Sequence, residues 1–439
     1  MTDWYYALLK SYFLGFTPFA YAFIAFLPWL FLTMFVAPRV FIDALQMVFY
    51  TMPLWVLYIT PHTVKHYWMH YIQHQFIDDP AQKPILLELL IPKDEMKSPR
   101  AMEVVFESLH YSLQMNPIFQ TQFKGHVRPW FTLEIASTEG KLRFYLWTWE
   151  KLRDRVEAAF YGQYPNLQII EADHDYSKRY DFDLDKPEMW GCSFKLEKGD
   201  AYPIKTYYEF ELEKDPKAEH RVDPFITMLE MMSTMGKHEH MWFQFLFQME
   251  HTDAWKDDVM KEIDRIYESA TPEHPGAKPG DKVKGFPQLR PLQYELIKGM
   301  ERCVTKHAFR VGIRGMVITD AGHFNFGHSQ TTQRMFGQNN AHEGSEYYNV
   351  LKLDPEQHLA GFDWPWEDYK GIRRSARARK LLDSYQKRSY FHPPYIMDPI
   401  ILTTEELATL FHIPGGESQV LGLTKTESKR GAPPPNLPS

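Results

Sequence analysis

The sequence predicts an α+β protein in which an N-terminal transmembrane helical hairpin is followed by two ferredoxin-like (βαββαβ) α/β sandwich units. Three observations lead to this prediction. Residues 12–36 carry no charged side chain. Residues 84–176 show strand and helix patterns in the order β-α-β-β-α-β, which is that of the split βαβ arrangement. Residues 198–353 follow a similar order.

The first 76 residues have the pattern of a membrane anchor. Tyr12–Val36 is uncharged and exceeds the about 20 apolar residues that cross a bilayer. Val40–Thr60 is a second candidate span, although Asp43 and Gln46 interrupt it. With the rest of the chain cytosolic, this predicts a location in the inner (cytoplasmic) membrane. The alternative is an apolar helical pair buried in a complex.

Residues 84–176 predict the first ferredoxin-like domain. A short apolar strand at residues 84–91 is followed by a helix at 101–113 whose apolar residues share one face. Two strand-like runs, WFTLEIAS and KLRFYLWT, are joined by Thr138, Glu139 and Gly140, a hairpin signal. A second helix and a fourth strand complete the series. Two helices on one face of four strands form a complete small core.

Residues 198–353 predict the second ferredoxin-like domain. Ile204–Leu212 alternates like a strand, a charged loop follows, and Asp223 with Pro224 begins a helix. HMWFQFLFQ then has the alternation of a strand. Because this succession matches that of the first domain, we interpret it as a degenerate internal repeat. Thr271–Pro287 is rich in Pro, Gly and Lys and predicts a flexible insertion.

Residues 354–414 contain a basic helix. Gly371–Arg388 contains seven basic residues and a single acidic residue, Asp383. Such a run can contact the phosphates of nucleic acid, although it lacks the interleaved aromatics of a single-strand track. The alternative is a solvated helix, or one that docks on an acidic partner. The candidate phosphate contacts are Arg373, Arg374, Arg377, Arg379 and Lys380.

A docking segment follows at Asp398–Pro414. Thr403 or Thr404 begins a short helix with Glu405 and Glu406 in its first turn, as the helix dipole favours. The predicted partner-docking face consists of Leu402, Leu407, Leu410 and Phe411. Residues 415–439 form a polar tail that ends in GAPPPNLPS, an extended proline-rich segment.

Composition and motifs exclude several classes of protein. The net charge of -7 argues against a generally basic nucleic-acid binder. The only cysteines, Cys192 and Cys303, make no CxxC pair, so a disulfide framework or cysteine zinc site is not expected. The sequence contains no GxxxxGK[ST], GxGxxG, GxSxG or HExxH motif. We therefore predict a protein that is not an enzyme, with no catalytic residue, cofactor or metal ligand identified.

Histidines recur at every fourth position from His62 to His74. On a helix they form one slowly drifting stripe, and neutral imidazoles at this spacing are able to bind zinc or copper. A metal-dependent enzyme built on this stripe is therefore a further alternative. The preferred interpretation is a polar helical stripe that uses histidine.

Four strings resemble the non-catalytic N-terminal region of bacterial conjugation-type (type IV secretion coupling) P-loop ATPases. They are Leu86–Leu113, Pro129–Ile169, Asp223–Gln248 and, most specifically, Ile400–Gly415 with its TEELATLFHIPG. In that family, segments like TEELATLFHIPG and PPNLP come just before the P-loop motor, whereas this sequence stops at Ser439.

The resemblance implies a membrane-anchored, non-enzymatic subunit that docks or tethers a separate P-loop ATPase. The machine would translocate DNA or protein, as in conjugation or type IV secretion. The membrane, DNA and further copies of the chain are the other candidate partners. The alternative function is a membrane-tethered nucleic-acid-binding module that uses the basic helix at residues 371–388.

Overall fold

The computed structural model describes most of the chain after residue 34. The described residues are 35–36, 38–92, 97–110, 118–180, 187–212, 223–275, 282–339, 348–354, 372–415 and 422–423. They belong to two compact units, which divide at residues 72 and 73.

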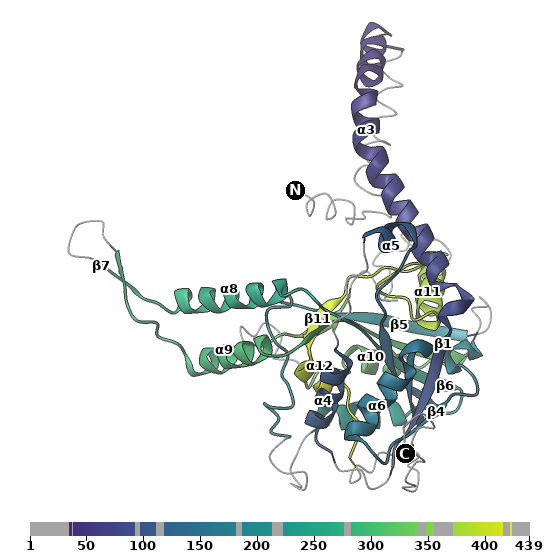
Figure 1. Cartoon of the computed structure of the whole chain (residues 1–439), viewed down its shortest axis with the longest axis vertical. Helices are drawn as coiled ribbons and strands as arrows, with labels where there is room; N and C mark the ends of the chain where they lie inside the picture. Colours follow the sequence, from purple (N-terminus) through teal and green to yellow (C-terminus); the bar gives the residue numbers. More distant parts are fainter. Residues whose placement is uncertain are drawn as a thin grey trace. The chain divides into compact units, whose positions relative to one another are not determined.

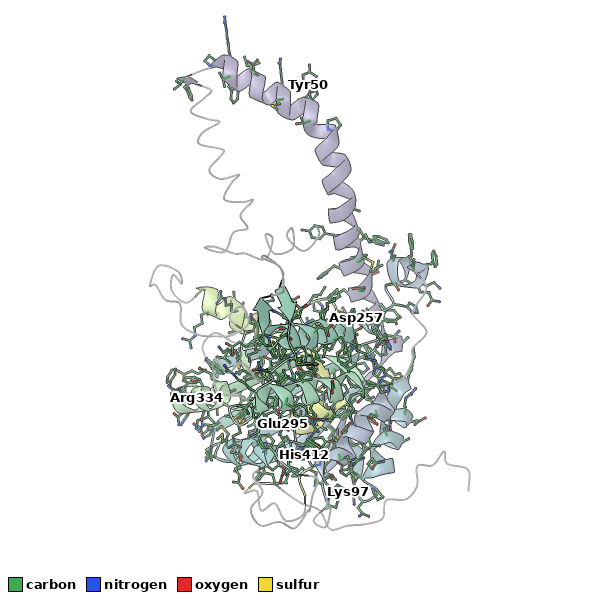
Figure 2. The ribbon with its side chains drawn as sticks, turned by 90° about the vertical axis from the view of Figure 1, so that its left-hand side faces the viewer. Tyr50, Lys97, Asp257, Glu295, Arg334 and His412 are labelled. Carbon is green, nitrogen blue, oxygen red and sulfur yellow. The ribbon has the colours of Figure 1, made fainter. Side chains whose placement is uncertain are left out.

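Residues 38–72 of the first unit lie in helix α3, which extends from Pro38 to Ile77. Many of its apolar side chains are exposed, and Tyr50 projects away from the helix (Figure 2). No helix in the described part of the chain is long and apolar enough to cross a membrane. The predicted transmembrane hairpin is therefore wrong, and so is the predicted inner-membrane location.

The composition of α3 explains part of this correction. The expected span Val40–Thr60 contains Asp43 and Gln46, and the same helix continues through Lys65 and a series of histidines. The apolar run is thus interrupted within a longer and more polar helix. The other expected span, Tyr12–Val36, lies outside the described residues except for its last two positions.

The second unit is built on one nine-stranded antiparallel sheet. The strand order is β10-β5-β9-β6-β2-β3-β1-β4, and β11 also pairs with β9. The strands are β1 (Pro84–Leu90), β2 (Phe131–Thr138), β3 (Lys141–Trp149), β4 (Gln168–Glu171), β5 (Pro187–Leu196), β6 (Glu239–Met249), β9 (Ala308–Asp320), β10 (Leu351–Leu353) and β11 (Ile400–Thr403).

The sheet corrects the prediction of two separate sandwich units. Strands β1 to β4 have the spatial order 4-1-3-2, and β5, β6, β9 and β10 repeat that order in the other half. β2 and β6 are the second strands of the two halves, and they pair with each other from Phe131↔Phe247 to Thr138↔His240. Both strands are almost wholly buried. Because an unpaired apolar edge promotes aggregation, joining the two edges into one sheet removes that hazard.

The second half begins with a strand that differs from the predicted one. Its first strand is β5, whereas the expected strand Ile204–Leu212 is irregular up to residue 206 and then forms turns. Two of its backbone N–H groups donate to side chains of the C-terminal segment instead of to a neighbouring strand. Ile204 donates to Glu406 at 3.0 Å, and Tyr207 donates to Thr409 at 2.9 Å. The predicted boundary at residue 198 therefore cuts off the strand that opens this half.

Helices cover both faces of the sheet (Figure 1). One face carries α4 (Pro99–Leu109), α6 (Arg153–Gln163), α7 (Pro224–Ser233), α10 (Phe326–Gln333) and α12 (Thr404–Leu410). The other face carries α11 (Ile372–Gln386) and the short helix η3 (Tyr176–Arg179). Two glycines lie at these contacts. A Cβ on Gly315 would lie 2.8 Å from Thr332 of α10, and a Cβ on Gly191 would collide with Leu381 of α11.

Helices α8 (Ala254–Ser269) and α9 (Pro291–Val304) lie side by side (Figure 1). They share a small apolar cluster of their own around Trp255, Ile263 and Met300. The segment between them, predicted as a flexible insertion, contains a two-stranded ribbon of β7 (Glu273–Pro275) and β8 (Lys282–Lys284). The smaller elements are α5 (Ile118–Phe123), η1 (Pro80–Gln82) and η2 (Glu150–Leu152).

Candidate functional site

A row of buried polar side chains crosses the centre of the sheet. Glu134 of β2 lies opposite Gln244 of β6, which lies opposite Arg314 of β9. The Arg314 guanidinium donates to the Gln244 side-chain oxygen at 2.6 and 2.8 Å, and the Gln244 amide donates to Glu134 at 2.7 Å. All three side chains are fully buried. Burial lowers the pKa of Arg314 to about 10, so it is still a cation at neutral pH.

The segment after α11 adds a second cation to this row. Arg388 is buried and donates to Glu134 at 3.0 and 3.1 Å and to Asp175 at 3.0 Å. Burial by itself would raise the pKa of Asp175, but the Arg388 guanidinium lowers it below its usual value. Arg388 thus pairs with both carboxylates, whereas Arg314 donates to the hydroxyl and backbone oxygens of Ser384 in α11 at 2.9 and 3.0 Å. These contacts connect α11 to the sheet.

Sequence reasoning misassigned Arg388. It counted this residue within an exposed basic run, whereas the structure buries it in the ion-pair network. Its neighbour Lys387 is half exposed and pairs with Asp383 at 2.9 Å. The sequence shows the excess of positive charge, but the partner carboxylates of Arg388 come from β2 and from the start of η3, more than 200 residues away.

The predicted phosphate contacts lie on the outer side of α11. Arg374, Arg377, Arg379 and Lys380 are exposed, while the side chain of Arg373 lies outside the described set. The opposite face of α11 is buried against the sheet through Ala378, Leu381, Leu382 and Tyr385. The helix therefore presents several cations to solvent from a fixed support.

The predicted docking face is inside the core. Leu402, Leu407, Leu410 and Phe411 are each at most 2% exposed, and every residue of α12 is buried. Strand β11 pairs with β9, and α12 packs against α4. The apolar face predicted from the sequence is real, but other parts of the same chain cover it. These four side chains therefore form no open surface for a partner.

Polar contacts also hold this segment in place. Thr403 is the N-cap of α12 and forms a capping box with Glu406. Glu405 accepts hydrogen bonds from Arg302 of α9 at 2.9 and 3.0 Å. His412 lies 2.9 Å from Asp223, the N-cap of α7. Burial raises the pKa of Glu406 to about 7.

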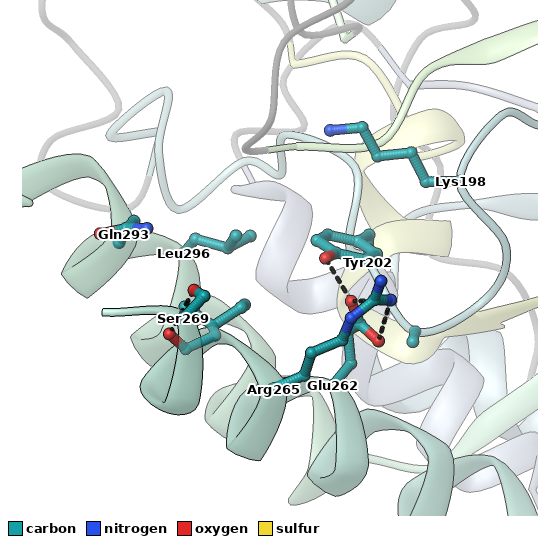
Figure 3. Close-up of a pocket in the computed structure, with 9 residues that line it drawn as sticks. Lys198, Tyr202, Glu262, Arg265, Ser269, Gln293 and Leu296 are labelled. Atoms are coloured by element: carbon teal, nitrogen blue, oxygen red, sulfur yellow. Dashed lines mark hydrogen bonds and ion pairs between the residues drawn. The ribbon is translucent and has the colours of Figure 1, made fainter. Parts of the chain in front are cut away.

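A pocket of about 520 Å³ lies between α8, α9 and residues 198–202 (Figure 3). The Tyr202 hydroxyl donates to Glu262 at 2.6 Å, and Glu262 also faces Arg265 at 3.4 Å. The Lys198 ammonium donates to the backbone carbonyl of Tyr348 at 3.1 Å. The polar side chains that line this pocket thus bind one another or nearby backbone groups, an arrangement that favours a structural role.

A second pocket, of about 540 Å³, is named here the tryptophan pocket. Three indole rings line it, and Trp130 lies 5.5 Å from Trp147 and 5.2 Å from Trp149 between ring centroids. The other lining residues are Ile77, Asp78, Pro84, Leu86, Asp175, Lys178, Asp383, Gln386, Lys387, Arg388, Ser389, Pro393 and Pro394. These residues are scattered over about 300 positions, so no local pattern in the sequence indicates the pocket.

The histidine stripe forms no metal centre in the part of the chain that the structure covers. Within that part, no group of three or more His, Cys, Asp or Glu side chains is positioned to hold a metal ion. His74 pairs with Asp78 at 2.8 Å. The side chains of His62 and His66 lie outside the description.

No protein-family model matches the chain, and no curated protein sequence matches it. The resemblance to coupling ATPases therefore rests on the four quoted strings alone.

Proposed function

We propose that this chain is a non-enzymatic platform that docks or tethers a P-loop ATPase in a conjugation- or type IV secretion-like machine for DNA or protein. The observation that carries the proposal is the position of the Ile400–Gly415 segment. This string has the most specific resemblance to the coupling ATPases, and it is buried among elements from both halves of the sheet.

The contacts of this segment support a role as a fixed attachment point for the tail that follows it. Helix α4 of the first half packs against α12, and Arg302 and Asp223 of the second half bind Glu405 and His412. Farther along, Leu142 donates its N–H to Gly422 at 3.0 Å, and Leu423 forms a parallel bridge with Leu142. The chain is thus attached to the body at two successive points before the proline-rich tail. A tether that starts from fixed points restricts where an attached partner can lie.

Capture followed by direct binding tests the proposal. The tagged full-length chain is recovered from its own cells, bound proteins are identified by mass spectrometry, and a recovered P-loop ATPase is purified. We expect it to bind the purified chain, with at least tenfold weaker binding after residues 424–439 are exchanged for a Gly/Ser sequence of equal length. Recovery of no P-loop ATPase, or of one that does not bind the purified chain, would refute the platform.

A second candidate, nucleic-acid binding, is favoured by the exposed cations of α11. Arg374 and Lys380 project from a helix whose other face is held on the sheet. Each phosphate contact that is lost lowers the slope of log affinity against log salt by about 0.9 for duplex DNA. We therefore expect Arg374→Glu/Lys380→Glu to lower this slope by about 2 in fluorescence anisotropy with a labelled duplex.

A charge-matched control separates this site from a general effect of charge. Lys261→Glu/Arg265→Glu makes the same change on the exposed side of α8, where the two side chains are 74% and 77% exposed. This control should leave the slope unchanged. Equal losses in both variants, or no binding by the native chain at 50 mM salt, would remove the α11 site. Measuring ATPase binding by Arg374→Glu/Lys380→Glu distinguishes the two candidates, because the platform proposal expects this variant to bind the ATPase as the native chain does.

A further inference from the structure

Three histidine rings, His110, His251 and His307, meet where α4 ends beside the sheet and are named here the histidine cluster. His110 is the C-cap of α4 and stacks on His307, with ring centroids 4.2 Å apart and planes inclined by 13°. The His251 ring, which follows β6, lies 6.0 Å from the His110 ring. His110 and His251 are half-buried and His307 is exposed, so the cluster opens to solvent on one side.

The surroundings of His110 offer little compensation for a positive charge on its ring. Its Nε2 lies 3.0 Å from the backbone oxygen of Glu250, and this nitrogen is the donor because a carbonyl oxygen only accepts. The carboxylate of Glu250 is bound elsewhere, since it accepts from the backbone N–H groups of His251 and Thr252 and from the Thr252 hydroxyl. Phe309 meets the His110 ring edge-on at 5.4 Å.

The elements around the cluster carry charges of both signs. Glu103 of α4 is neutralised by Lys306, the residue before His307. The other charged groups that the structure describes on these elements are Glu107 of α4, Glu250 after β6, Arg310 of β9 and Arg128 before β2. No salt bridge joins a carboxylate to any of the three imidazoles among the described residues. A proton on His110 would therefore face two other imidazoles and no paired carboxylate.

Burial lowers the pKa of His110 from its usual value of 6.5, and the His307 and His251 rings act in the same direction. The hydrogen bond to the Glu250 carbonyl opposes this shift without reversing it. Burial and Arg128 likewise lower the pKa of His251. The unfolded chain thus binds protons at an acidic pH at which the folded chain keeps both rings neutral. The resulting stabilisation is complete above about pH 6.5 and is lost as the pH falls through the folded-state values.

Backbone contacts connect the cluster to the C-terminal segment. The Thr404 N–H, at the start of α12, donates to the backbone oxygen of His307 at 3.0 Å. Thr403 of β11 pairs with Ala308, whose carbonyl accepts the Glu250 N–H at 3.1 Å. Helix α4, which ends at the cluster, packs against α12. A separation of the three rings would therefore act first on β11 and α12.

We propose that the histidine cluster is an acid-sensitive switch, in which protonation of His110 separates the end of α4 from residues 307–308 and loosens β11 and α12. The switch goes beyond the platform function, because it concerns how residues 400–412 are held on the body, whichever partner the chain binds. Glu406 titrates in the same segment with the opposite sign. A comparison between variants that all retain Glu406 cancels its contribution.

Hydrogen exchange of the full-length chain, measured by mass spectrometry at pH 7.5 and pH 5.5, tests the proposal. Rates are corrected for the intrinsic effect of pH with an unstructured reference peptide, which gives the opening constant of the amides in residues 400–412. His110→Gln keeps a donor near the position of Nε2 and removes the titration. One histidine changes such a constant by at most about tenfold per pH unit below 6.5. We therefore expect acidification to increase opening about three- to tenfold more in the native chain than in this variant.

A second variant and two controls make the result specific. His307→Gln changes the exposed ring of the stack and should lessen the acid response in the same direction. His174→Gln changes an exposed histidine outside the cluster and should respond like the native chain. The amides of β4, at the edge of the sheet and five strands from β9, should keep their protection. Equal acid responses in the native chain and both cluster variants would overturn the proposal, as would an equal loss of protection in β4, because global unfolding would then explain it.

Discussion

The buried carboxyl group of Glu406 should make the stability of this fold depend on pH in a defined direction. Its side chain is 4% exposed and accepts hydrogen bonds from Thr403 N–H at 2.8 Å, the Thr403 hydroxyl at 2.8 Å and Ile204 N–H at 3.0 Å. Burial raises its pKa from 4.5 to about 7, although these hydrogen bonds act in the opposite direction. Substitution by glutamine removes the titration and keeps the shape.

The sign follows from the two pKa values. Between pH 4.5 and 7 the folded chain holds a proton on Glu406 that the unfolded chain releases. This contribution to the free energy of unfolding is complete below pH 4.5 and is lost as the pH rises through 7. Each pH unit between the two values corresponds to about 1.4 kcal/mol, so the whole window amounts to about 3 kcal/mol.

Urea denaturation at pH 5 and pH 8, followed by tryptophan fluorescence, measures the effect. The free energy of unfolding of Glu406→Gln, taken relative to the native chain, should increase by about 2 to 3 kcal/mol from pH 5 to pH 8. Glu150→Gln, at a half-exposed site that faces Lys83, is the control and should show a difference independent of pH within about 0.5 kcal/mol. A Glu406→Gln difference that is equal at both pH values would refute the reasoning.

Three further predictions concern packing. Arg388→Met leaves Glu134 and Asp175 without their cation and should lower the free energy of unfolding by about 3 to 5 kcal/mol, read from the urea midpoint. Gly312→Ala would bring a Cβ within 2.6 Å of the Tyr390 ring and should lower the free energy of unfolding by about 1 to 3 kcal/mol. Gly162→Ala in α6 meets nothing within 4 Å and should raise the free energy of unfolding by about 0.5 to 1 kcal/mol. Equal shifts of the melting temperature for the two variants would contradict this. Leu407→Asp should prevent folding because it buries an unpaired charge, and a folded variant with a native circular dichroism spectrum would show that this face is open after all.

Local patterns identified most elements of the first half. Apolar periodicity and the turn at Glu139 and Gly140, both with positive φ, predict the four strands and the two longer helices between residues 84 and 171, but not α5. Periodicity describes which face of an element is apolar, but it does not say what covers that face. For this reason the apolar face of α12 was recognised and its partner was not, since α4 lies about 300 residues earlier.

The errors have the same origin. The pairing of β2 with β6 joins residues about 110 positions apart, and nothing within either strand distinguishes an edge that binds its own chain from one that binds another. The turns at Ile204–Leu212 alternate like a strand, yet side chains of α12 bind their backbone donors. Arg388 resembles its exposed basic neighbours, and only the opposing carboxylates of Glu134 and Asp175 reveal its burial.

The burial of α12 against α4 has a consequence for synthesis. During translation the apolar residues of α4, among them Met102 and Phe106, leave the ribosome about 300 residues before the helix that covers them. At elongation rates of about 5 to 20 residues per second, that interval lasts about 15 to 60 s. The nascent chain therefore spends this time with this apolar surface not yet covered by α12, a state in which aggregation is favoured. A message truncated before codon 400 would yield a fragment that aggregates or is degraded instead of a shorter working protein.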